Sequence, residues 1–154
     1  MRTMGIDYGD ARVGVAVSDG LGITAQGVAT VPNRVYDKMM DRLVSLIAEY
    51  DAETVVIGLP KNMDGTQGER CDVTRSFAED LKQRAPQIEI VFRDERLSTV
   101  QAAGILNVTN TRGKDRKNVI DTVSACIILE DYLNSKNKGE NENGRKQKNI
   151  TFYR

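Results

Sequence analysis

Three carboxylates lie in separate segments of the sequence, in comparable settings, and are candidates for one acidic site. Asp7 lies at the end of a short apolar run, beside glycines that leave room near its carboxylate. Glu95 follows the apolar segment 88–93, and Asp121 opens the last helical pattern on its apolar side. Carboxylate oxygens are ligands that Mg²⁺ and Mn²⁺ prefer, often shared with substrate phosphates. We predict that Asp7, Glu95 and Asp121 converge to hold such ions.

Each acid also has an ordinary structural explanation. Asp7 could cap a turn, Glu95 could belong to a solvated charge run, and Asp121 could be a first-turn acid favoured by the helix dipole. Asp121 is the most specific of the three, because the other residues on its helix face are Ala125, Ile128 and Tyr132. An acid buried on such a face costs free energy unless a cation compensates its charge.

Basic residues precede Asp121 and favour a polyanionic substrate. The segment 112–117 carries four cations and is interrupted only by Asp115. Loosely placed lysines and arginines hold a phosphate backbone, although an ordinary solvated loop has the same composition. We expect phosphate contacts from five cations: Arg12, Arg96, Arg112, Lys114 and Lys117. The loop 58–69 could also cradle a phosphate before a helix, but it lacks the P-loop Gly-Lys-Ser/Thr, so a plain turn is the alternative.

The composition excludes several classes of protein. The 154 residues contain no histidine and two distant cysteines, so a zinc site or a histidine base is not expected. A hydrophobic share of 40% and a charged share of 29% are typical of a soluble domain. No apolar segment is long enough to span a membrane, and no signal peptide is recognisable. We therefore expect a cytoplasmic protein with no membrane partner.

The elements that must position the acids follow from periodicity and turn signals. The patterns predict strands at 3–8, 12–18 and 23–30, a helix capped by Asn33, a strand at 55–59, a helix at 69–84, a strand at 88–93, a short helix at 98–106 and a last helix at 118–134. Three antiparallel strands followed by strand–helix alternation predict an α/β fold with a mixed five-stranded sheet. Right-handed crossovers then place helices on both faces.

The chain divides unevenly in charge. Residues 135–154 contain six Lys or Arg and two Glu, so the first 134 residues carry the compensating negative charge. Few apolar residues follow 134, and we expect a domain at 1–134 followed by a basic flexible tail at 135–154. A basic tail on an acidic domain fits a nucleic-acid partner, although a tail that only aids solubility has the same charge.

Four blocks of sequence, in order, resemble the YqgF family of bacterial proteins, also called Holliday junction resolvases. The blocks are 4–9 with 12–19, 56–60 with 64–65, 94–99, and 121–129, and the resemblance covers roughly residues 3–133. It implies a ribonuclease H-like fold and acidic site positions at Asp7, Glu95 and Asp121. It also implies trimming of the 5′ end of precursor small-subunit rRNA. Asp10 and Ala11 stand where the family commonly has a basic residue, with Arg12 following.

We therefore expect a metal-dependent nuclease acting on precursor rRNA or branched DNA, as a monomer or weak homodimer. Asp7 would bridge two ions, with Glu95 and Asp121 each holding one side. Segment 5–9 also resembles the phosphate-binding hairpin of the actin and hexokinase ATPases, but those proteins close two such domains around the nucleotide. A non-catalytic nucleic-acid-binding module is the remaining alternative.

Overall fold

The computed structural model describes residues 2–60, 68–94, 113–139 and 150–153, with side chains described at 2–60, 68–94 and 122–136. Its centre is one sheet with the strand order β3-β2-β1-β4-β5-β6. The strands are β1 (Arg2–Tyr8), β2 (Arg12–Ser18), β3 (Ala25–Pro32), β4 (Ala52–Leu59), β5 (Glu89–Asp94) and β6 (Ile150–Tyr153). The pairs β1–β2 and β2–β3 are antiparallel, and the others are parallel. The predicted mixed arrangement of the first five strands is confirmed.

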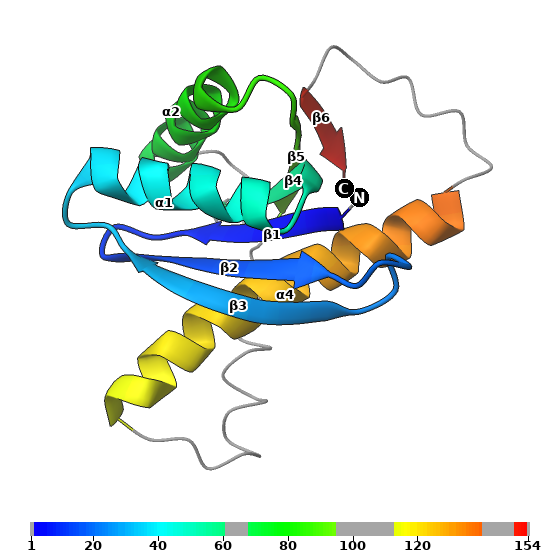
Figure 1. Ribbon diagram of the computed structural model, residues 1–154, viewed down its shortest axis with the longest axis horizontal. Helices are drawn as coiled ribbons and strands as arrows, with labels where there is room; N and C mark the ends of the chain where they lie inside the picture. Colours follow the sequence, from blue (N-terminus) through cyan, green and yellow to red (C-terminus); the bar gives the residue numbers. More distant parts are fainter. Residues whose placement is uncertain (1, 61–67, 95–112, 140–149, 154) are drawn as a thin grey trace.

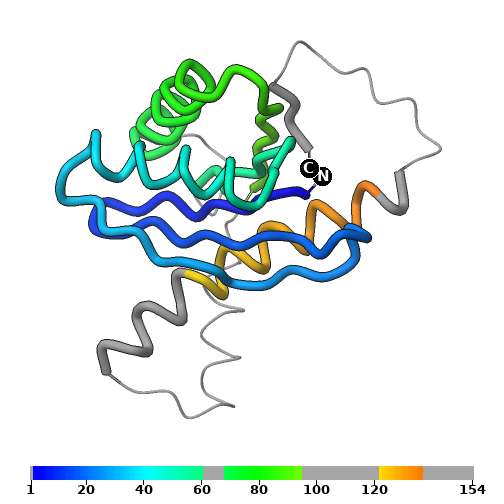
Figure 2. Tube along the Cα trace, in the orientation of Figure 1, coloured from blue at the N-terminus to red at the C-terminus, as the bar shows by residue number. Residues whose placement is uncertain are grey.

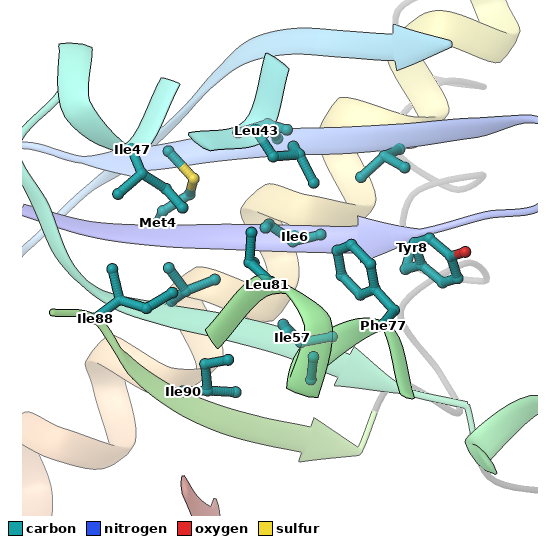
Figure 3. Close-up of a cluster of buried hydrophobic side chains, with 14 of the residues drawn as sticks. Met4, Ile6, Tyr8, Leu43, Ile47, Ile57, Phe77, Leu81, Ile88 and Ile90 are labelled. Carbon is teal, nitrogen blue, oxygen red and sulfur yellow. The ribbon is translucent and has the colours of Figure 1, made fainter. Parts of the chain in front are cut away.

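Helices cover both faces of the sheet, as predicted. Helices α1 (Tyr36–Glu49) and α2 (Glu69–Arg84) lie on one face, and α4 (Gly113–Gly139) crosses the other diagonally (Figure 1). The larger core packs Met4, Ile6 and Tyr8 of β1 against α1 and α2 (Figure 3). A smaller core packs α4 against residues such as Ala16, Val56 and Val91. The alternation of β1 therefore directs its odd-numbered residues toward α4.

Several local predictions differ from the structure. Strand β3 is shifted along the chain, and α1 begins after Val35, without a side-chain cap. Asn33 instead donates from Nδ2 to the Gly9 carbonyl oxygen, at 2.9 Å, and ties the β3 end to the β1–β2 turn. Helix α2 has the predicted bounds, and its buried face consists of Cys71, Thr74, Phe77, Ala78 and Leu81. The predicted helix at 98–106 lies outside the described residues.

Two elements near the C-terminus differ from those expected from the sequence. Helix α4 continues to Gly139, and β6 pairs in parallel with β5 from Ile90↔Ile150 to Arg93↔Tyr153. The scarcity of apolar residues after position 134 does not prevent this strand from forming. Strand β5 offers backbone N–H and C=O groups at its edge, and β6 can pair with them without a hydrophobic core of its own. Within the described parts of the chain, no helix is long and apolar enough to cross a membrane.

Deleting residues 140–154 is expected to leave the domain folded, because the described residues of both cores lie before position 134. The deletion removes β6 and leaves β5 as an open edge, so self-association should increase. Thermal unfolding should show a melting temperature lowered by a few degrees, and light scattering should show a larger apparent mass. An unfolded truncated chain would contradict this expectation.

Cys126 is half-buried against the α4 core. Burial raises the pKa of its thiol to about 11, and the nearby Glu130 carboxylate adds to the shift. The thiol is therefore protonated at neutral pH and is a poor nucleophile. Its chemistry is that of a packing residue.

Candidate active site

Asp7 lies near the carboxyl end of β1, a central strand with β2 on one side and β4 on the other. Met4, Ile6 and Tyr8 face the core under α1 and α2, so Gly5 and Asp7 face α4. The Asp7 side chain is half-buried. The carboxyl ends of strands in open α/β sheets are where ligands bind, and Asp7 lies at that edge.

Glycines flank Asp7 on both neighbouring strands. Gly14 of β2 is its direct partner, and Gly58 of β4 follows Ile57, the partner of Ile6. Both glycines face α4, since each lies two residues from a residue of the α4 core: Gly14 from Ala16, and Gly58 from Val56. Because neither glycine has a side chain, neither flanking strand places a side chain beside the Asp7 carboxylate.

Arg93 continues the same row on the next strand. It is the β5 partner of Gly58. It lies two residues after Val91 of the α4 core, so it too faces α4. The residue is only 9% exposed, and Nη2 lies 3.7 Å from Oδ2 of Asp131 in α4. Among the described residues, Nε and Nη1 have no hydrogen-bond partner. Unpaired buried guanidinium donors are costly, so Arg93 is a candidate anion ligand.

Arg93 was missed by sequence reasoning, although a signal existed. It follows Val91 at a spacing of two within a buried strand, which predicts that a charge faces the same side as the core. The sequence could not show that Arg93 and Asp7 face the same side of the sheet, because this depends on the pairing of Arg93 with Gly58.

Arg70 of α2 holds the turn that follows Asp7. Its Nη2 donates to the Tyr8 carbonyl oxygen at 2.9 Å, its Nη1 pairs with Asp10, and its guanidinium lies 5.7 Å from the centre of the Tyr8 ring. The Tyr8 ring stacks on Phe77, with centroids 4.1 Å apart. Helix α2 thus fixes the carboxyl end of β1 from the face opposite to Asp7.

Helix α4 lies very close to the sheet at two glycines, Gly5 of β1 and Gly27 of β3. A Cβ at Gly5 would lie 2.7 Å from the Ala125 carbonyl oxygen and 2.8 Å from Leu129 Cβ, and a Cβ at Gly27 would lie 2.9 Å from Thr122 Cβ. These contacts place the helix directly on the sheet, one turn after Asp121. Asp121 is therefore carried by the turn of α4 that precedes the contact with β1, while its side chain is outside the described residues.

The remaining predicted site residues are only partly placed. Arg12 begins β2, opposite Pro32, and is half-buried. Lys114 and Lys117 lie in the first turns of α4, with side chains outside the described set. Glu95, Arg96 and Arg112 lie outside the described residues altogether. Among residues with described side chains, no group of three Asp, Glu, Cys or His is close enough to hold a metal ion.

A family model described as "RuvX: Holliday junction resolvase" matches residues 1–135 of the chain. The chain belongs to the RuvX family. The match covers the first five strands and most of α4, and it confirms the family resemblance inferred from the four sequence blocks. Strand β6 lies beyond the matched residues.

RuvX relatives with curated names are similar over most of the chain. A protein of Halothermothrix orenii is 46% identical over 138 residues, covering 90% of this chain and 98% of its own length. One from Acetivibrio thermocellus is 44% identical, covering 90% and 99%, and one from Bacillus thuringiensis is 44% identical, covering 88% and 100%. All three are named "Putative pre-16S rRNA nuclease".

Solved structures share the RuvX fold at low identity. A Thermus thermophilus RuvC in complex with a Holliday junction substrate is 12% identical, with a TM-score of 0.56 over 90% of this chain and 96% of that one. A fowlpox virus resolvase with Holliday junction DNA is also 12% identical, with a TM-score of 0.57 over 88% and 98%. The predicted ribonuclease H-like fold is thereby confirmed.

Proposed function

We propose that this RuvX-family protein is a nuclease that hydrolyses phosphodiester bonds in structured nucleic acid, with precursor 16S rRNA as its substrate. The observation that carries the proposal is the position of Asp7: a half-buried carboxylate at the carboxyl end of a central strand, with a glycine on each flanking strand. The names of relatives 44–46% identical support both the reaction and the substrate.

Asp7, Glu95 and Asp121 would hold divalent Mg²⁺ or Mn²⁺. The surroundings of Asp7 fit this use, because Gly14 and Gly58 place no side chain beside its carboxylate on the α4 face. Hard carboxylate oxygens are also the correct donors for these cations. When bound, the ions supply an activated water nucleophile and neutralise charge on the phosphate. The chain has no histidine to act as a general base, which agrees with this division of roles.

The chain's own residues would orient the substrate. Asp7 fixes the position of the site on a central strand whose end is held by Arg70. Arg12, Arg96, Arg112, Lys114 and Lys117 would contact phosphates, which sets the register of the backbone but reads no sequence. We expect the protein to act in the cytoplasm, as a monomer or weak homodimer.

Holliday junction resolution is the second candidate, favoured by the description of the family and by the two structures of resolvases with junction DNA. A junction is two-fold symmetric, so its resolvase should be a dimer that makes paired cuts. Cleavage of a precursor 16S rRNA fragment and of a four-way DNA junction, side by side with Mg²⁺ or with EDTA, distinguishes the two. No metal-dependent cleavage of either substrate would leave a binding module.

Replacing Arg93 by Met is expected to lower the cleavage rate at least about tenfold, because charged hydrogen-bond donors aimed at a phosphate stabilise the transition state. The free energy of unfolding should stay unchanged or rise, by up to about 2 kcal/mol, because a buried charge with unpaired donors is replaced by an apolar chain of similar volume. Single-turnover cleavage and urea unfolding measure the two effects.

The control for Arg93 is Asp131→Asn, which removes only the long ion pair at 3.7 Å. It should change neither quantity appreciably, because Asp131 is 60% exposed and the pair is too long for a hydrogen bond. An Arg93→Met variant that cleaves at the wild-type rate would assign Arg93 a packing role alone.

A further inference from the structure

Beside the β3 edge of the sheet lies a groove of about 470 Å³ between β3 and the first half of α1. Val31, Val35 and Met39 give it apolar walls, and three cations line it: Arg34, Lys38 and Arg42. The chain passes from β3 directly into α1, so two consecutive elements form the groove (Figure 2). Lys38 and Arg42 are four residues apart and therefore share one flank of α1, and Arg34 precedes the helix at the same spacing.

The cations of this groove are exposed, and none of them forms an ion pair with an acid among the described residues. The two acids in the first half of α1 are directed elsewhere. Asp37 and Asp41 both pair with Arg84 of α2, at 2.8 Å and 3.5 Å. Helix α1 thus separates its charges, with the acids toward α2 and the bases along the groove. The groove is left with a local excess of positive charge.

The groove lies on the α1 face of the sheet and Asp7 faces α4, so the two are connected around the edge of β3. Thr30, which lines the groove, pairs with Gly14, and Gly14 pairs with Asp7. Two strand spacings, or about 10 Å, therefore separate the backbone of Asp7 from this edge. Pro32 of the groove pairs with Arg12, a predicted phosphate contact. Cations therefore continue from the strand next to Asp7 around the edge of β3.

We propose that this groove binds the phosphate backbone of a single-stranded segment of the nucleic-acid substrate that extends from the scissile bond past Arg12. The proposal rests on the proposed function and adds a second binding surface to it. Charge complementarity selects a polyanion, and the apolar walls accommodate sugar faces. Pockets of about 300–1,000 Å³ hold a small ligand, so the groove suits a short single strand and not a duplex.

The test is binding of a fluorescently labelled single-stranded RNA, measured by anisotropy in EDTA so that no cleavage occurs. Lys38→Glu with Arg42→Glu is expected to weaken binding at least tenfold. The plot of the logarithm of the association constant against the logarithm of the salt concentration should become less steep, by about 1.4. Each phosphate contact on a single strand contributes about 0.7 to this slope. The matched control is Arg2→Glu with Arg75→Glu, which changes the net charge equally at positions outside the groove. It should weaken binding less than threefold.

Equal losses in the two double variants would overturn the proposal, because only the net charge would then matter. Unchanged binding by the groove variant would overturn it as well, and a changed mass in size-exclusion chromatography would then identify a second copy of the chain as the occupant. Lys38→Gln with Arg42→Gln, which removes charge without reversing it, repeats the test if the Glu variant does not fold. RNA that binds through the groove but is never cut would contradict the nuclease assignment and leave the groove in place.

Discussion

Asp7→Asn is expected to lower the rate of metal-dependent cleavage at least about 10³-fold, a loss on the order of 4 kcal/mol of transition-state stabilisation. The substitution keeps the shape of the side chain but removes the negative charge with which Asp7 would help to hold divalent ions. Single-turnover cleavage of precursor 16S rRNA measures the effect. The melting temperature should change by a few degrees at most, because the packing of β1 is retained.

Asp10→Asn is the matched control for Asp7→Asn, since it makes the same chemical change three residues along the chain. Asp10 is 87% exposed and pairs with Arg70 at the surface of the turn. Its loss should leave the cleavage rate within about twofold of wild type, because exposed ion pairs contribute little. Glu95→Gln and Asp121→Asn should resemble Asp7→Asn. Wild-type rates in all three acid variants would refute the assignment of the site.

Gly5→Val is expected to destabilise the protein by about 3 kcal/mol or more, at the upper end of the range for overpacked cores. The first added carbon would already lie 2.7 Å from the Ala125 carbonyl oxygen and 2.8 Å from Leu129 Cβ. Neither can rotate away, because one is helix backbone and the other is the first carbon of its side chain. Urea unfolding measures the loss. Cleavage should fall as well, because moving α4 moves Asp121.

Gly20→Val is the control for this effect, since a Cβ at Gly20 meets nothing within 4 Å. It should change the free energy of unfolding by no more than about 0.5 kcal/mol, as is usual at exposed positions. If Gly5→Val is as stable as Gly20→Val, then α4 does not pack on β1 as closely as the structure shows.

The elements of this fold follow from the sequence because their signals are local. The turn at Gly9 and Asp10 predicts the β1–β2 hairpin, and the turn formers and Pro86 predict the bounds of α2. Signals at element ends are weaker. Asn33 is a suitable helix cap by residue type, yet it bonds to the Gly9 carbonyl, which is 24 residues away. A residue that can cap a helix can equally bond a distant turn, and only the folded chain decides between them.

For the candidate site, the sequence determined the acids and their family, because residue type and motif order are properties of the chain itself. Asp7 is recognisable at a strand end from the apolar run before it and the glycines beside it. Only the tertiary structure decided what surrounds it, since the neighbours of a strand depend on strand order and register. Gly14, Gly58 and Arg93 come from three strands, and the pairing of those strands sets them in one row with Asp7. The separation of charge on α1 likewise depends on where α2 and β3 pack, and no local pattern contains that information.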